Sequence, residues 1–183
     1  MMNAIISKLD PESSGTVTDL WRKLREACGL NAIYDLPLPH LTWMVAEELD
    51  IQKSAPILTQ ISDTTAPLTL HTFGLGVFTG EKPVLYLPLV KSVEMIDLHE
   101  KIWDQISPFS KDQKLYYSPR LWVPHITLAL NDLNKETLAC AINTIGSDTI
   151  ELFIQISDLA VARYEEKKAG EILKDFKLSQ TKL

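Results

Sequence analysis

The tetrapeptides Pro39-His40-Leu41-Thr42 and Pro124-His125-Ile126-Thr127 repeat one pattern, Pro-His-x-Thr, with their histidines 85 positions apart (125 minus 40). Apolar residues follow each tetrapeptide, so both predict a strand, over residues 40–46 and 122–130. Residues two apart on a strand point to the same side. Each histidine therefore shares a strand face with its threonine, while the residue between them points the other way.

The sequence around the motifs predicts the order strand, helix, strand, helix, strand, and it does so twice. Apolar residues at helical spacing indicate helices over residues 17–28, 54–62, 92–106 and 134–145. Apolar runs bounded by turn residues indicate further strands over residues 3–9, 67–77, 83–90, 149–164 and 171–178. Loops over residues 31–39 and 107–120 lead into the two motif strands.

Residues with capping preferences mark the ends of two of these helices. Thr16 and Asp19 together are expected to begin the first helix in the manner of a capping box, and Gly29 is expected to end it. Asn134 is expected to begin the last helix and Gly146 to end it.

The repeated order predicts an α+β fold that is bilobal and internally duplicated. We expect two antiparallel sheets, flanked by outer helices, around a central cleft. Residues 1–183 then form one bilobal domain, whose motif-bearing parts are about 1–82 and 83–183, with strands exchanged between the lobes. Two similar lobes would bring the motif strands to opposite sides of the cleft.

Composition narrows the class of protein. Hydrophobic residues make up 45% of the 183-residue chain and charged residues 23%, as in ordinary globular proteins. No apolar run approaches the ~20 residues of a membrane helix, and the first ten residues lack the pattern of a signal peptide. We therefore expect a cytoplasmic monomer that does not bind membranes.

The net charge of −6 bears on the partner. Proteins that bind long nucleic acids usually present a basic face, because neutralising phosphates supplies much of the affinity. No lysine and arginine cluster of that kind is visible here. A nucleotide-like ligand is therefore expected to be small or an RNA end, and no long duplex is expected.

The motif residues are suited to chemistry on a phosphodiester. An unperturbed imidazole titrates near pH ~6.5, so His40 and His125 can supply one base and one acid at neutral pH. The hydroxyls of Thr42 and Thr127 can donate hydrogen bonds to charge that develops on phosphate oxygens. One His-x-Thr alone carries little information, but two at equivalent places in similar halves indicate a shared site.

On these two motifs the sequence resembles the two-histidine (2H) phosphoesterase superfamily, the 2′,5′ RNA ligase-like and cyclic phosphodiesterase group. The resemblance implies that His40 and His125 are the acid–base pair, and that Thr42 and Thr127 hold the phosphoryl oxygens. It implies opening of 2′,3′-cyclic phosphates, hydrolysis of related cyclic or 2′,5′ linkages, or reversible RNA end joining, with no metal and no cofactor.

Two other functions stay open. Some members of the bacterial RNA ligase branch have arginines five residues before and five after the second histidine; this chain has Arg120 and Leu130 there. Because of that departure, the substrate of the ligase branch is not carried over to this chain, and RNA end joining is kept as an alternative. A nucleotide-binding module could also use the four motif residues to hold a phosphate without turnover.

The remaining candidates fall into two groups. Tyr34, Tyr117 and Arg120 lie in loops before the motif strands, where they could stack a base or contact a phosphate. Structural roles are expected for the other conspicuous residues. His99 is expected at a core or boundary position, Trp43 and Trp122 in the core, and His71 in a structural role within its strand. Cys28 and Cys140 are expected to pack as small reduced apolar residues, and residues 163–168 to form a solvated hairpin turn.

Overall fold

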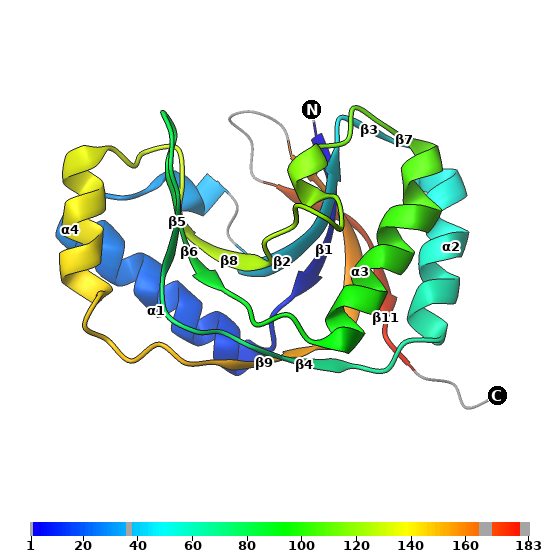
Figure 1. Ribbon diagram of the computed structural model, residues 1–183, viewed down its shortest axis with the longest axis horizontal. Coiled ribbons are helices and arrows are strands. Elements are labelled where there is room, and N and C mark those ends of the chain that lie inside the picture. Colours follow the sequence, from blue (N-terminus) through cyan, green and yellow to red (C-terminus); the bar gives the residue numbers. More distant parts are fainter. Residues whose placement is uncertain (1, 36–37, 165–169, 180–183) are drawn as a thin grey trace.

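The computed structural model describes residues 2–35, 38–164 and 170–179 (Figure 1). Its α-helices are α1 (Pro11–Cys28), α2 (Ile51–Asp63), α3 (Val93–Ile106) and α4 (Lys135–Ile145). Its strands are β1 (Met2–Lys8), β2 (His40–Ala46), β3 (Glu48–Leu49), β4 (Leu68–His71), β5 (Gly76–Phe78), β6 (Val84–Pro88), β7 (Ser110–Lys111), β8 (His125–Ala129), β9 (Phe153–Ile156), β10 (Asp158–Tyr164) and β11 (Glu171–Lys177). The described ranges also hold three short 3₁₀ helices: η1 (Ala32–Asp35), η2 (Ser107–Phe109) and η3 (Leu115–Tyr117).

The ends of the helices follow from capping side chains. Helix α1 begins earlier than either Thr16 or Asp19, because the Asp10 side chain accepts a hydrogen bond from the Ser13 backbone N–H at 3.0 Å and proline follows at the first helical position. Gly29 ends α1 in the left-handed conformation, with φ of 72°, as predicted. Asn134 begins α4 through a reciprocal capping box, also as predicted.

Two long predicted strands are each divided. The stretch 67–77 breaks at Gly74, whose φ of 72° takes the chain out of extended backbone, and this separates β4 from β5. The stretch 149–164 breaks at Ser157, so that β9 and β10 pair in different sheets. The second motif strand is shorter than predicted, because it begins after Pro124.

One antiparallel sheet of seven strands runs through both halves of the described chain, in the order β11-β10-β1-β2-β8-β6-β5. The prediction of two sheets on either side of a cleft is therefore wrong in this respect. The motif strands β2 and β8 are neighbours that pair at Leu41 and Ile126. The small pairs β3–β7 and β4–β9 lie outside this sheet.

Helices flank the sheet as two pairs, α1 with α4 and α2 with α3, on the two sides of β2 and β8 (Figure 1). Each pair combines one helix from each half of the chain, since α1 and α2 precede residue 83 and α3 and α4 follow it. Strand β1 likewise lies between β2, from the first half of the chain, and β10, from the second half. The chain thus crosses repeatedly between the two regions.

The face of the sheet toward the helices carries the core. Leu41, Trp43 and Ile126 are at most 1% exposed and belong to one hydrophobic cluster with residues of α1 to α4. Trp122 is 2% exposed, so the core positions predicted for both tryptophans are confirmed. His99 is also buried, on α3, as its apolar neighbours indicated.

The two cysteines differ from the prediction of reduced thiols. Cys28 and Cys140 form a disulfide that joins the end of α1 to α4, across 112 residues of sequence. The packing of α1 against α4 brings these two side chains together. Their sequence spacing alone gave no indication of that pairing, so this prediction is wrong.

Two further predictions concern surface segments. None of the helices in the described ranges is long and apolar enough to cross a bilayer. The hairpin turn predicted for residues 163–168 lies largely outside the described residues, since only Arg163 and Tyr164 of that segment, at the end of β10, are described.

Candidate active site

The pairing of β2 with β8 places the four motif side chains on one face of the sheet. Leu41 lies opposite Ile126 in an antiparallel register, the one pair that β2 and β8 share among the described residues. Both residues are buried on the helix side, so the alternation along each strand turns His40, Thr42, His125 and Thr127 to the opposite face. The two histidines lie close enough for the charge of His125 to lower the pKa of His40.

The two imidazoles are held in the same way. His40 Nδ1 lies 2.6 Å from the Leu38 carbonyl oxygen, and His125 Nδ1 lies 2.7 Å from the Val123 carbonyl oxygen. A carbonyl oxygen can only accept, so each Nδ1 carries the proton and donates. The Nε2 atom of each neutral imidazole is left as the atom that can exchange a proton with a ligand.

Burial lowers the pKa of both histidines. For His40, burial outweighs the opposite effect of the Leu38 carbonyl, and the charge of His125 lowers the pKa further. For His125, burial again outweighs the effect of the Val123 carbonyl. Desolvation disfavours the imidazolium form, whereas a bound phosphate anion would favour it.

The threonines are fixed through their backbone. The Trp122 indole N–H donates to the Thr42 carbonyl oxygen at 3.1 Å, and the Trp21 indole N–H donates to the Thr127 carbonyl oxygen at 3.0 Å. Both tryptophans are 2% exposed and lie in the core cluster. Each motif is thus supported from the helix side of the sheet.

Tyrosines flank the motif residues on the β1–β10 side. The Tyr164 hydroxyl lies 3.4 Å from His40 Nε2, and the two rings stack with centroids 6.2 Å apart. Burial raises the pKa of Tyr117, against the smaller effect of its hydrogen bond with Thr42. Tyr117 and Tyr164 also pack on a small buried apolar cluster of this region: Ala4, Ile6, Val45, Ala160 and Ala162.

Aromatic rings also flank the motif residues on the β5–β6 side. Tyr86 lies opposite Thr127 in the register of β6 and β8, and its ring centroid is 5.1 Å from that of His125. Phe78 stacks on Tyr86 at 4.2 Å and meets His125 edge-on at 4.9 Å. A Cβ atom at Gly76 would lie 2.3 Å from the Tyr86 ring, so only glycine leaves room for this arrangement.

The other loop candidates lie in different surroundings. Tyr34 packs edge-on against Trp21, with ring centroids 6.1 Å apart, and the Arg25 guanidinium lies 4.9 Å from its ring. Arg120 is exposed in the turn before Trp122. Of the three, Tyr117 is the one with a described contact to a motif residue.

Three aromatic residues near the histidines, Tyr164, Phe78 and Tyr86, were not among the predicted site residues. They come from strands far from the motifs in sequence, and only the pairing of β6 with β5 and β8, and of β10 with β1, brings them near the histidines. An expected strand register could have placed Tyr86 beside the second motif. Nothing in the local sequence of Tyr164 marks it.

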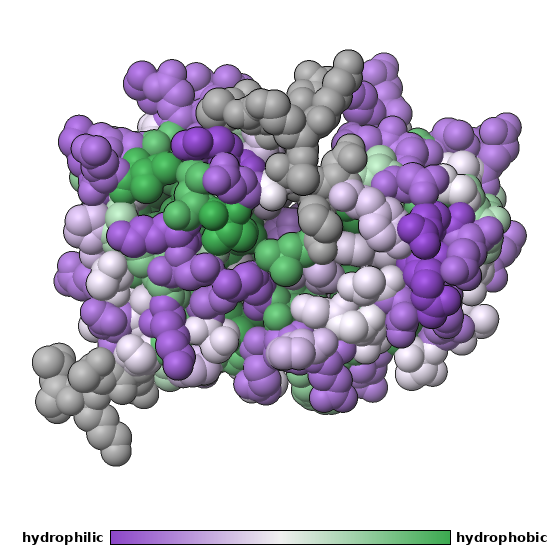
Figure 2. Space-filling model, turned by 180° about the vertical axis from the view of Figure 1, so that it is seen from behind, coloured by the Kyte–Doolittle hydropathy of each residue, from purple (hydrophilic) through white to green (hydrophobic). Residues whose placement is uncertain are grey.

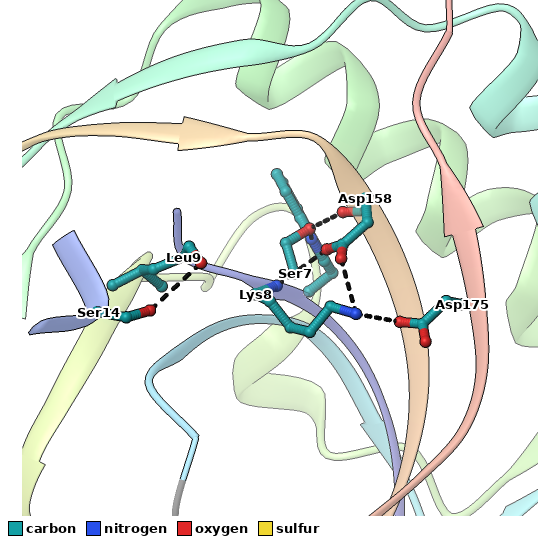
Figure 3. A network of polar contacts seen from close by, with 7 residues as sticks. Ser7, Lys8, Leu9, Ser14, Asp158 and Asp175 are labelled. Carbon is teal, nitrogen blue, oxygen red and sulfur yellow. Dashed lines mark hydrogen bonds and ion pairs between the residues drawn. The ribbon is translucent and has the colours of Figure 1, made fainter. Parts of the chain in front are cut away.

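Lys8, the cationic residue beside His40 in the sheet, forms ion pairs with two aspartates outside the motifs. Lys8 lies opposite His40 in the register of β1 and β2. Its ammonium group pairs with Asp158 at 3.0 Å and with Asp175 at 2.5 Å, as Figure 3 shows. This network ties β1 to β10 and β11 beside the motif strand.

Two described hollows lie away from the histidines. One, of about 470 Å³, lies between α1 and residues 148–152, and the other, of about 360 Å³, lies between residues 48–53 and 108–111. The central cleft stays a prediction.

Seen from behind the view of Figure 1, the molecular surface is mostly polar, and apolar surface gathers at the upper left (Figure 2). Within the described ranges, no three His, Cys, Asp or Glu side chains could hold a metal ion together.

A family model described as the 2'-5' RNA ligase superfamily matches residues 10–168, which include both motifs and the two strands that carry them. The chain belongs to the 2'-5' RNA ligase superfamily. The resemblance to 2H phosphoesterases seen in the motifs is thereby confirmed. No curated relative matches the chain.

Solved structures share the fold of this superfamily member over nearly its whole length. TT0787 of Thermus thermophilus is similar with a TM-score of 0.70 and 17% identity, covering 99% of this chain and 100% of that one. LigT of E. coli, in a complex with 3'-AMP, is similar with a TM-score of 0.63 and 17% identity, covering 97% and 98%. At this identity the likeness shows the fold alone.

Proposed function

We propose that the protein is a metal-independent 2H phosphodiesterase that hydrolyses a 2′,3′-cyclic phosphate or a related cyclic or 2′,5′ nucleotide linkage. The observation that carries the proposal is the single sheet face shared by His40, Thr42, His125 and Thr127. Both imidazoles hold Nδ1–H against a carbonyl, so proton transfer falls to Nε2, which in His40 lies 3.4 Å from the Tyr164 hydroxyl.

The arrangement supports an in-line displacement at phosphorus. One neutral imidazole takes a proton from water as the water oxygen bonds to phosphorus. The other, protonated, imidazole gives its proton to the ribose oxygen as the bond from phosphorus to that oxygen breaks. The threonine hydroxyls donate to the two non-bridging oxygens, where negative charge increases. The product is a ribose phosphomonoester.

The surroundings of the motif residues fit a nucleoside ligand. Phe78 is half-buried beside His125 and offers an aromatic ring on which a base can stack. The structures of E. coli LigT include complexes with 3'-AMP, ATP and NADP+. Those ligands belong to LigT, and here they support a substrate of nucleotide size.

The proposal is tested by hydrolysis of a substrate panel. The panel holds nucleoside 2′,3′-cyclic phosphates, ADP-ribose 1″,2″-cyclic phosphate, 2′,5′-linked oligonucleotides and cyclic dinucleotides, each assayed with the wild type and His125→Ala. We expect turnover of at least one class, with kcat lowered by ~10²–10⁴ or more in His125→Ala. Equal activity in the two proteins would reveal a contaminating nuclease.

A nucleotide-binding module is the second candidate, because the same four residues could hold a phosphate without turnover. It predicts nucleotide binding by the wild type, no hydrolysis across the panel, and weaker affinity in each motif variant. RNA end joining is tested in the same series, with a 2′,3′-cyclic phosphate end and a 5′-hydroxyl end as substrates.

A further inference from the structure

Two buried indoles make crossed contacts with the motif threonines. Trp21, in α1, precedes the first motif and donates to the carbonyl of Thr127 in the second. Trp122, just before the second motif, donates to the carbonyl of Thr42 in the first. The two bonds span 106 and 80 residues of sequence, so each half supports the other half's motif.

These contacts lie where the sheet is most weakly joined. Strands β2 and β8 share only the register pair Leu41 and Ile126 among the described residues, whereas β1 and β2 share six pairs. A short ladder leaves the relative rotation of two strands poorly constrained. The position of one threonine relative to the other therefore needs a further constraint.

A hydrogen bond to a backbone carbonyl restrains the whole peptide plane, and with it the direction of the adjoining Cα–Cβ bond. The Thr42 and Thr127 hydroxyls project to the opposite side of the sheet from the two indoles. A rotation of this peptide plane turns the threonine hydroxyl away from a phosphate oxygen, and a hydrogen bond weakens as its donor angle falls well below 150°.

We propose that Trp21 and Trp122 are positioning residues that set the spacing and direction of the two threonine hydroxyls for the phosphoryl group. The proposal rests on the proposed function for its effect on rate. Its structural part, the coupling of each indole to one threonine of the opposite half, can be measured by phosphate binding without turnover.

Trp43 provides a matched control. It is equally buried, lies in the same core cluster, directly follows Thr42 and packs on Trp122 with ring centroids 5.4 Å apart. Its indole N–H donates at 2.8 Å to the Ser7 hydroxyl and not to a motif carbonyl, so Trp43→Phe separates loss of indole packing beside the motif from loss of a bond to a threonine carbonyl. Replacement by phenylalanine removes one buried indole hydrogen bond in each of Trp21→Phe, Trp122→Phe and Trp43→Phe. The three variants should lose similar melting temperature.

Their activities should separate. Trp21→Phe and Trp122→Phe should each lower kcat by at least about 10-fold, and by no more than the ~10²–10³ expected for removing the threonine hydroxyl itself. Trp43→Phe should keep kcat within about 2-fold. Because a misdirected hydroxyl acts mainly on the charge that develops in the transition state, KM should change less than kcat.

Crossed double-mutant cycles give the decisive measurement. In a Thr127→Ala background, Trp21→Phe should cause no further loss of kcat, whereas in a Thr42→Ala background it should lower kcat by the same factor as in the wild type. For Trp122→Phe, the further loss should be absent in Thr42→Ala and complete in Thr127→Ala. Losses that multiply in all four combinations, or an equal kcat loss in Trp43→Phe, would overturn the proposal.

The same cycles are run on the Kd for inorganic phosphate. If the wild type binds phosphate but hydrolyses no panel substrate, the proposed function fails while the crossed pattern in Kd still supports the two tryptophans. The positioning role is overturned if crossed coupling is absent from kcat, or, in a protein that binds phosphate without turnover, if it is absent from Kd. A wild type that neither binds phosphate nor hydrolyses the panel would overturn both.

Discussion

The buried imidazole of His99 should make the stability of the protein depend on pH. His99 lies beneath the candidate site, where it is 2% exposed. Its Nε2 donates to the Trp43 carbonyl oxygen at 3.0 Å, and its ring stacks on Trp122 with centroids 3.8 Å apart. Burial lowers the pKa of His99 from 6.5 to about 4. The unfolded chain therefore binds a proton at a higher pH than the folded one.

The sign and the size of the effect follow from that difference. Stability from the neutral imidazole is fully present above pH 6.5, and it is lost as the pH falls from 6.5 toward the folded pKa of about 4. Each pKa unit corresponds to about 1.4 kcal/mol, so His99 should cost the folded state about 3 kcal/mol between pH 7.5 and pH 4.

Urea unfolding at the two pH values measures this cost, with His99→Gln as the control. The glutamine amide can still donate to the Trp43 carbonyl but cannot titrate. The loss of unfolding free energy on acidification should be about 3 kcal/mol larger in the wild type than in the variant, because the other titrating groups are common to both. Equal losses in the two proteins, or an NMR titration of His99 with a midpoint near 6.5, would refute the reasoning.

Three further predictions concern the site and the disulfide. Because burial lowers the pKa of both motif histidines, the dependence of kcat/KM on pH should be bell-shaped with its maximum below pH 6.5. The pH profile of kcat should lie at higher pH, since a bound anion favours the imidazolium form. A kcat/KM maximum near pH 8 would contradict this. Gly76→Ala should displace Tyr86 from His125, which should lower the free energy of unfolding by about 1–3 kcal/mol and raise KM. The control Gly15→Ala adds a Cβ atom into open space, so it should neither destabilise the protein nor raise KM. Replacing Cys28 and Cys140 together by serine should lower the free energy of unfolding by as much as ~5 kcal/mol, because the disulfide closes a loop across 112 residues. Detection of two reactive thiols in the unreduced wild type would exclude the disulfide itself.

The strand period and the motif duplication supported most of what the sequence could predict. The alternation of His40, Leu41 and Thr42 is enough to place a histidine and a threonine on one face, and the structure has that alternation in both motif strands. The α+β class followed from the order of apolar patterns. Asn134 identified the start of α4 because its side chain and Thr137 can cap each other locally.

The features that were missed depend on contacts between distant residues. The start of α1 was missed because residues 11–16 are mostly polar and show no apolar spacing, although Asp10 and Pro11 form a strong start signal. The direct pairing of β2 with β8 and the disulfide arise from packing across the chain, which no local pattern encodes. The same holds for the aromatic rings near the histidines.

The position of β1 in the sheet has a consequence for synthesis of the protein on the ribosome. Its neighbour β10 follows only after most of the chain, since 150 residues separate Lys8 from Asp158. At about 5–20 residues per second, roughly 8–30 s pass between translation of the two. During that interval β1 has an open edge, and α1 lacks α4 for most of it, so the nascent chain presents unpaired strand and apolar surface to chaperones. Folding of the site must then be largely post-translational, and a chain truncated before β10 should accumulate as aggregate or be degraded.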